Sequence, residues 1–246
     1  MGTAIAVVSG KGGTGKTSFV ANVGIALARL GYRVLCLDCD IGLRNLDLAL
    51  GLSDRAVMDF TDVIRGLCSL EDAAAPHPAQ RNLYLLTAPV RMATGLTEAD
   101  FTGLMDEIRS QFDFCLIDAG AGLGEAFRLA AAGADRAIVV TTTDPTSLRD
   151  AQRTVMELDR LPRGKIHMVV NRCKKKLLRT LRQTIDDAID AAGLPLLGVI
   201  PEDDDLPLAL GRGIPLMLTH NRCAAVAYTN TALRITGQRV PLMRIK

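Results

Sequence analysis

The residues with the clearest chemistry lie near the N-terminus, in the run Ser9-Gly-Lys-Gly-Gly-Thr-Gly-Lys-Thr-Ser18. The segment from Gly10 to Thr17 fits the phosphate-loop pattern G-x-x-x-x-G-K-[ST]. Glycines allow positive φ angles, so backbone N–H groups can point inward at phosphate oxygens. We expect Lys16 to reach the β- and γ-phosphates of a nucleotide and the hydroxyl of Thr17 to bind Mg²⁺. The nucleotide-binding residues expected here are Gly12, Gly13, Thr14, Gly15, Lys16, Thr17 and Ser18.

Carboxylates follow two further apolar runs, where strands would end. Asp38 and Asp40 follow the run that begins at Arg33, and Asp118 closes Phe112-Asp-Phe-Cys-Leu-Ile-Asp118. A carboxylate in such a place can bind Mg²⁺ through water or orient an attacking water. Asp118 fits the Walker B pattern. A single strand-end acid is usually a turn or cap residue, but the phosphate loop upstream favours a magnesium role for Asp118.

These motifs need a fold that brings several strand ends together. Short apolar runs predict strands at 3–8, 33–38, 83–87, 113–118, 136–142, 165–171 and 195–200. Helical periodicity predicts helices at 16–30, 55–65, 97–111, 124–133, 146–160, 175–192, 203–211 and 222–236. This alternation predicts an α/β fold with a doubly wound, mostly parallel sheet flanked by helices on both faces. Ligands of such sheets lie at the carboxyl ends of the strands.

The chain shows no internal repeat and no linker-like tract, so residues 1–246 are predicted to form a single domain, with 73–79 as a surface loop. The formal net charge is +2 and aromatic residues make up 4%, which argues against general nucleic-acid binding and base-stacking platforms. No apolar run approaches the ~20 residues that cross a bilayer. With no leader-like N-terminus, a cytoplasmic protein is expected. The basic run 172–182 can meet DNA, an anionic membrane or an acidic partner, although a solvated helix face is the simpler interpretation.

Cys36 and Cys39 form a C-x-x-C spacing, which raises a redox or metal interpretation. Residues three apart on a strand face opposite sides, and no second pair completes a zinc site. We therefore expect the cysteines to be small buried apolar residues. The six are Cys36, Cys39, Cys68, Cys115, Cys173 and Cys223.

The phosphate loop contains a second lysine, Lys11, and the resulting K-G-G-x-G-K-T resembles the deviant Walker A motif of the MinD/ParA ATPase family. A second segment looks like the MinD branch of this family, namely Asp38-Cys-Asp-Ile-Gly-Leu-Arg-Asn-Leu-Asp-Leu48. Generic ParA proteins match this segment less fully. The resemblance runs from Ala4 to Met243. It implies a P-loop ATPase that forms a homodimer around ATP and Mg²⁺ and places the division septum. It also implies that Lys11 reaches the partner's phosphates and stabilises the transferring charge.

The resemblance implies roles for residues beyond the phosphate loop. Asp40 would position the attacking water, Asp38 would lie near Mg²⁺, and 40–48 would be a loop that responds to the γ-phosphate. Gly12 and Asn45 would join Lys11 at the dimer interface.

The segment after Asp118 departs from the family pattern. It reads Asp118-Ala-Gly-Ala-Gly-Leu-Gly124, where D-S-P-A-G-I-E is typical. Gly122, which lies near the γ-phosphate in relatives, is kept. Gly120 replaces a proline and Gly124 replaces an acid, so this loop should be more flexible and less charged.

Two later strand ends resemble the family's adenine pocket, namely Asn171-Arg172 and Pro201-Glu202-Asp203. A side-chain amide can both donate to and accept from a purine edge. A GTPase would show N-K-x-D, but no Asp follows Asn171 in this run, so ATP is favoured. Taken alone, Asn171 could also be a turn residue.

Partner binding is also implied by the resemblance. The segment Asp144-Pro-Thr-Ser-Leu-Arg-Asp150 opens a helix, with Thr146 or Ser147 as its expected N-cap, on which MinC-like and MinE-like regulatory proteins would dock. The last helix should close at Gly237. The nine residues after it contain Pro241 and cannot form the family's amphipathic membrane helix, so stable anchoring is not expected.

Two other functions remain open at this point. One is a ParA-like ATPase that segregates DNA or plasmids, and the other is a nucleotide-dependent scaffold with little hydrolysis. An iron protein of the same superfamily is disfavoured, because no cysteine follows Asp118 in the matching loop.

Overall fold

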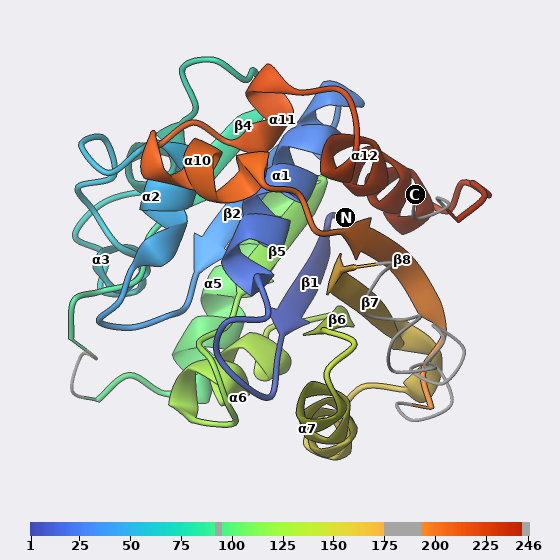
Figure 1. The fold of residues 1–246 in the computed structure, drawn as a ribbon. Helices are drawn as coiled ribbons and strands as arrows, with labels where there is room; N and C mark the ends of the chain where they lie inside the picture. Colours follow the sequence, from blue (N-terminus) through green and yellow to red (C-terminus); the bar gives the residue numbers. More distant parts are fainter. Residues whose placement is uncertain (92–94, 175–192, 243–246) are drawn as a thin grey trace.

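The computed structural model describes residues 1–91, 95–174 and 193–242. An eight-stranded sheet of order β3-β4-β2-β5-β1-β6-β7-β8 runs through its centre (Figure 1). All neighbours pair in parallel except β3 and β4, which pair antiparallel at one edge. The strands are β1 (Thr3–Val8), β2 (Val34–Asp38), β3 (Ala75–Pro76), β4 (Leu83–Leu86), β5 (Phe114–Asp118), β6 (Arg136–Thr141), β7 (Ile166–Cys173) and β8 (Leu196–Pro201).

Helices cover both faces of the sheet, as Figure 1 shows. On one face lie α1 (Lys16–Arg29), α2 (Asn45–Leu50), α10 (Asp205–Gly211), α11 (Leu216–Thr219) and α12 (Ala224–Ile235). The other face carries α5 (Glu98–Gln111), α6 (Glu125–Ala132) and α7 (Pro145–Met156). The remaining short helices are α3 (Phe60–Ile64), α4 (Leu70–Ala73) and a 3₁₀ turn at Arg163–Lys165.

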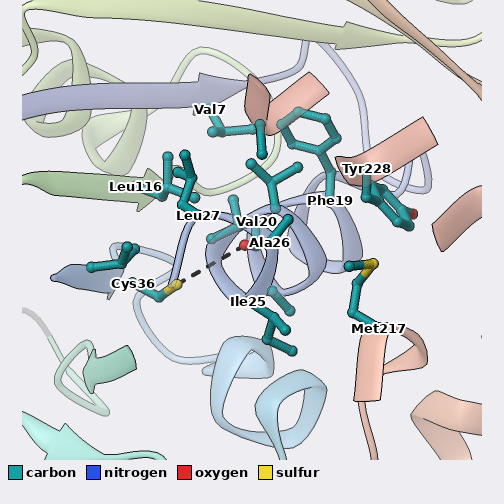
Figure 2. Packing of buried hydrophobic residues seen from close by; sticks show 14 of the residues in the cluster. Val7, Phe19, Val20, Ile25, Ala26, Leu27, Cys36, Leu116, Met217 and Tyr228 are labelled. Carbon is teal, nitrogen blue, oxygen red and sulfur yellow. Dashed lines mark hydrogen bonds between the residues drawn. The ribbon is translucent and has the colours of Figure 1, made fainter. Parts of the chain in front are cut away.

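The core has two layers, one on each face of the sheet. Along β1, Ile5 and Val7 belong to the layer under α1, whereas Ala4, Ala6 and Val8 belong to the opposite layer. Strands buried on both faces explain the continuous apolar runs of the sequence. Figure 2 shows α1 surrounded by its layer, with Phe19 against the ring of Tyr228 at a centroid distance of 6.2 Å.

The structure confirms the predicted fold class. The seven predicted strands are all present, each within two residues of its predicted bounds. Cys36 and Cys39 lie in opposite core layers, as period-two geometry requires. All six cysteines are free, but the expectation that all are buried is wrong for Cys223, which is exposed, and for Cys68, which is half-buried.

The predicted surface loop at 73–79 is wrong in part. Ala73, Ala74 and Ala75 are buried, β3 pairs with β4, and His77 is buried as well. The predicted loop at 40–48 becomes helical from Asn45 onward. Elements of two to six residues show no measurable periodicity, which is why they escape a sequence pattern.

Among the helix starts that differ from the prediction, two are explained by their N-caps. The helix expected over 55–65 covers only Phe60–Ile64, because Asp59 caps it by accepting from the amides of Thr61 and Asp62. Helix α7 begins at Pro145 with Asp144 as N-cap, so the prediction of Thr146 or Ser147 as cap is wrong. Proline fixes φ near the helical value and is well suited to the first helical position.

Several predictions concern segments outside the described residues. These include the helix at 175–192, most of the basic run 172–182 and the last four residues of the tail. Helix α12 ends just before Gly237, whose φ of +90° matches the predicted helix-closing glycine. Within the described ranges, no helix combines the length and the apolar character that crossing a membrane requires.

Candidate functional site

The phosphate loop connects β1 to α1 and depends on two glycines in left-handed conformations. Gly13 has φ +81° and Gly15 has φ +83°. A Cβ on Gly15 would lie 2.5 Å from Nδ2 of Asn171, so a side chain has neither the right backbone nor enough space there. That amide nitrogen donates to the carbonyls of Thr14 at 2.8 Å and Gly15 at 3.4 Å. β7 therefore holds the loop in place.

Lys16 forms a buried ion pair with Asp118. Its Nζ lies 2.8 Å from Oδ1 of Asp118, and the two side chains are 7% and 1% exposed. Strand pairing brings this about, because Asp118 lies beside Val7 of β1 and opposite Asp38 of β2. The other carboxylate oxygen of Asp118, Oδ2, is buried with no hydrogen-bond partner among the described residues.

Two further acids, at the end of β2 and just after it, lie near this ion pair: Asp38 pairs in register with Asp118, and Asp40 interacts with the charge of Lys16. Asp38 is buried, and its carboxylate accepts from the amides of Asp40 at 2.8 Å and Leu46 at 3.1 Å. Burial, followed by the charge of Asp118, raises the pKa of Asp38 to about 7. Burial also raises the pKa of Asp40, while the nearby charge of Lys16 opposes that shift. The charge of Asp118 thus acts on both Asp38 and Asp40, and carboxylates that repel one another favour an additional cation.

The donor atoms at this end of the site fit magnesium. Thr17, Asp38 and Asp118 supply hydroxyl and carboxylate oxygens, which are the ligands that Mg²⁺ takes in proteins. The unpaired, buried Oδ2 of Asp118 is the atom of this chain that a magnesium-bound water would satisfy. The described residues contain no group of three His, Cys, Asp or Glu side chains that would hold a metal by themselves.

An open cleft of about 690 Å³ lies over the phosphate loop. A smaller pocket of about 210 Å³ adjoins it, and the two share Gly15, Ser18 and Leu210. The cleft is lined by Ser9, Lys11, Gly12, Gly13, Thr14, Gly15, Lys16, Thr17, Ser18, Asp40, Leu43, Asn45, Leu48, Ala49, Ala121, Leu210 and Gly211. The small pocket contains all five residues predicted at the base, which are Asn171, Arg172, Pro201, Glu202 and Asp203, and adds Leu206 and Pro207.

Several polar side chains of the small pocket form hydrogen bonds or ion pairs within the chain. Arg172, at φ +54°, donates to the Gly13 carbonyl at 3.0 Å and pairs with Glu202 at 3.3 Å. Asp203 accepts from the amides of Asp205 at 3.1 Å and Ala224 at 3.1 Å. Asp203 thus fastens the starts of α10 and α12, and its carboxylate positions the pocket wall.

The second lysine of the loop is held by its own chain. Nζ of Lys11 lies 2.5 Å from Oδ2 of Asp144 and 2.7 Å from Oγ1 of Thr146, at the start of α7. Hydrogen bonds from Lys11 and Thr146 lower the pKa of Asp144 to about 2. The Lys11 side chain is 35% exposed. Gly12 and Asn45, the other predicted interface residues, are exposed on the lining of the same cleft.

Gly122, which the resemblance places near the γ-phosphate, lies beside the phosphate loop. Its amide donates to the carbonyl of Ser9 at 3.2 Å, and its φ is +83°. Gly120 approaches Asp40, since a Cβ there would lie 3.3 Å from Oδ1 of that carboxylate. The loop after β5 is therefore close to both the phosphate loop and the carboxylate of Asp40.

Sequence reasoning missed several residues of this site. Leu43, Leu48 and Leu210 are exposed apolar side chains on the lining of the cleft, and no motif marks them. The contact between Lys11 and Asp144 joins positions 133 residues apart. Only the tertiary packing that brings the start of α7 against the phosphate loop reveals it, so no local pattern could have predicted it.

Comparisons with known proteins agree with this geometry. Residues 5–216 match the family model described as "CobQ/CobB/MinD/ParA nucleotide binding domain". The septum site-determining protein MinD of Thermotoga maritima is 39% identical over 247 residues, covering 98% of this chain and 91% of the relative. The MinC:MinD cell division protein complex of Aquifex aeolicus contains a chain with TM-score 0.90 and 35% identity, covering 98% of both chains.

Two further structures bear on ligand and function. The septum site-determining protein MinD of Pyrococcus horikoshii, complexed with Mg-ADP, has TM-score 0.81 and 31% identity and covers 96% of both chains. A ParA family ATPase from Chlorobium tepidum has TM-score 0.82 but only 22% identity, covering 95% of this chain and 99% of that one. At that identity the likeness concerns the fold alone.

Proposed function

The chain belongs to the CobQ/CobB/MinD/ParA nucleotide-binding family as a MinD-type ATPase that regulates placement of the division septum, and from this we propose how its residues carry out the reaction. The observation that carries the proposal is the buried pair of Lys16 and Asp118 beneath the cleft, next to the base pocket. With the terminal phosphates present, Lys16 leaves Asp118 and donates to their oxygens. Asp118 would then be free to accept a hydrogen bond from a water held by Mg²⁺.

Other residues of the chain bind the metal, bind the phosphates and orient the attacking water. Thr17, Asp38 and Asp118 would hold Mg²⁺, Asp118 through a bound water, and the ion would supply positive charge to neutralise the phosphates. Backbone amides of Gly13 to Ser18 donate to phosphate oxygens from the loop and the first turn of α1. Asp40 accepts a hydrogen bond from the attacking water and orients it. Its side chain lies on the lining of the cleft, which is where that water must approach.

ATP is the nucleotide that the small pocket favours. Both contacts of the Asn171 amide with the phosphate loop use Nδ2, so Oδ1 is the atom available to a base. An acceptor oxygen pairs with the amino group of adenine and opposes the carbonyl of guanine. Arg172, Pro201 and Glu202 complete the walls.

Hydrolysis is coupled to dimerisation through Lys11. In the single chain this amine is bound to Asp144, away from its own phosphates. We infer that a second copy, docked with its cleft facing this one, receives Lys11 at its terminal phosphate. Gly12 and Asn45, exposed at the same opening, would lie at the contact.

The partners follow from the family and from α7. A MinC-type protein is the partner that the Aquifex complex supports, and we extend this to a MinE-type activator. Helix α7 begins at the Lys11 contact, so a protein on its exposed face would influence the release of that amine. A cytoplasmic location, with peripheral membrane contact through partners, fits this scheme.

Phosphate release and oligomeric state test the proposal together. ATP hydrolysis should be present in the wild-type chain and absent in Lys16→Ala and Asp40→Ala. A sizing run should show a dimer with ATP and a monomer with ADP. Hydrolysis that persists in both variants would overturn the assigned roles, and a wild-type chain that binds ATP without releasing phosphate would support the scaffold alternative.

A further inference from the structure

Helix α2 is held at both ends by residues outside it. At its start, the amide of Leu46 donates to Oδ2 of Asp38 at 3.1 Å. At its end, the carbonyl of Leu50 accepts from Nε2 of His77 at 3.1 Å, in a buried position. Six residues are too few for a helix to be stable alone, so these contacts and the core packing determine where α2 lies.

His77 is suited to act as a fixed clamp. Its Nδ1 accepts from the amide of Ala79 at 3.1 Å, so the proton of the neutral ring lies on Nε2, the atom that donates to Leu50. Its backbone amide donates to the carbonyl of Leu83 at 2.9 Å, which fastens it to β4. Burial lowers the pKa of His77, the hydrogen bond to Leu50 opposes that shift, and the nearby charge of Arg55 adds to it.

The end of α2 also touches the turn after α10. Gly51 caps α2 with φ +67°, and a Cβ there would lie 2.0 Å from the carbonyl oxygen of Gly213. The two backbones are therefore in direct contact. Helix α10 supplies Leu206 and Leu210 to the base pocket, and Leu210 also lines the phosphate cleft.

We propose that α2 couples occupation of the base pocket to the carboxylate of Asp38, with His77 as the positioning residue that makes the coupling possible. A base against α10 fixes the turn at Gly213, and this turn fixes Gly51. Because His77 holds the end of α2, the constraint reaches the amide of Leu46 and hence Asp38. The proposal rests on the magnesium role assigned above to Asp38.

The test compares a ligand that has a base with one that has none. The free Mg²⁺ concentration at half-saturation is measured by thermal shift with AMPPNP and with inorganic tripolyphosphate. In the wild-type chain, the base should lower this concentration about fivefold or more relative to tripolyphosphate, as expected for coupled sites. The two ligands differ in their own affinity for Mg²⁺, so the coupling is read from the change between variants: in His77→Ala the advantage of AMPPNP over tripolyphosphate should shrink about fivefold or more relative to the wild type.

Further variants distinguish a loss of coupling from a general destabilisation of the fold. His77→Gln keeps an amide donor for Leu50 and should retain most of the ratio. Gly51→Ala places a Cβ against the carbonyl of Gly213 and should also reduce the ratio of the two Mg²⁺ concentrations. It tests the coupling even if His77→Ala does not fold. Gln80→Ala, in the same loop with its side chain on the Arg81 carbonyl, is the matched control and should behave like the wild type.

The outcomes distinguish this proposal from the one on which it rests. AMPPNP binding in every variant, with an unchanged ratio in His77→Ala and Gly51→Ala, would overturn the coupling alone. Failure of the wild-type chain to bind either ligand with Mg²⁺ would overturn the nucleotide site as well.

Discussion

The amine of Lys11 lies 2.5 Å from Oδ2 of Asp144, so the single chain binds internally the group that we assign to a partner's active site. Both side chains remain partly exposed, at 35% and 47%. Ion pairs of this kind contribute roughly 0–1 kcal/mol. The contact is thus weak enough to be exchanged for a phosphate when a second copy docks.

Replacing Asp144 by Asn should favour the dimer. The change removes the charge that retains Lys11, and the start of α7 loses no side-chain cap, because Asp144 makes none. The ATP-dependent dimerisation constant should tighten by up to about fivefold. Sedimentation equilibrium with AMPPNP measures it. Asp159→Asn, an exposed acid beyond the end of α7, is the control, and equal constants in the two variants would count against an internal retention of Lys11.

Removing Lys16 should destabilise the nucleotide-free protein. Asp118 would keep a buried charge without its partner, and breaking such a pair costs about 3–5 kcal/mol. Urea unfolding of Lys16→Met should show this loss. Adding Asp118→Asn should recover most of the stability without restoring hydrolysis. If the free energies of unfolding of Lys16→Met and of the double variant are similar, the unpaired charge of Asp118 costs little stability and the argument is wrong.

A methyl group on Gly15 should disrupt nucleotide binding. It would meet Nδ2 of Asn171 at 2.5 Å and force alanine into φ +83°, which costs about 1–2 kcal/mol. The Kd for ADP should rise tenfold or more in Gly15→Ala. At Gly103, in α5, no atom lies within 4 Å of an added Cβ, so Gly103→Ala should bind ADP normally. Fluorescent ADP titration checks both, and equal affinities would contradict the steric argument.

Replacing Asp38 by Asn should change the pH dependence of stability. The folded pKa of Asp38, about 7, lies above its value in the unfolded chain, because burial disfavours the charge. The folded state therefore holds this proton more tightly, and ionisation destabilises the fold as pH rises through 7. Without nucleotide, the Tm of Asp38→Asn minus the Tm of the wild type should become larger as the pH is raised from 6 to 8.5. A constant difference across that range would contradict the shift.

The long elements could be predicted from the sequence because each carries its own signal. The strand at Thr3–Val8 and helix α1 follow from a buried apolar run and from the glycines and lysine between them. The phosphate loop, the acids at the ends of β2 and β5, and the two strand ends at the base pocket lie at the same edge of the sheet, as expected for strand ends, while their roles stay predictions. That residues 1–246 form one domain stays a prediction.

The remaining features depend on contacts between distant segments. Helix α2 forms although the sequence predicted a loop, because Asp38 and His77 satisfy its ends from elsewhere in the chain. His77 itself lies in the stretch predicted as a surface loop, where buried alanines and a paired edge strand replace solvent. Short elements of this kind are specified by tertiary packing rather than by local pattern.

Mixing two inactive variants tests the central claim most directly. Lys11→Ala keeps an intact site but has no amine to offer, and Asp40→Ala offers its Lys11 but cannot orient water in its own site. If Lys11 acts across the dimer, the equimolar mixture should release phosphate at up to about one quarter of the wild-type rate, since half of the dimers are mixed and each has one competent site. If the mixture stays as inactive as either variant alone while mixed dimers form, Lys11 does not act in its partner's site and the account is wrong.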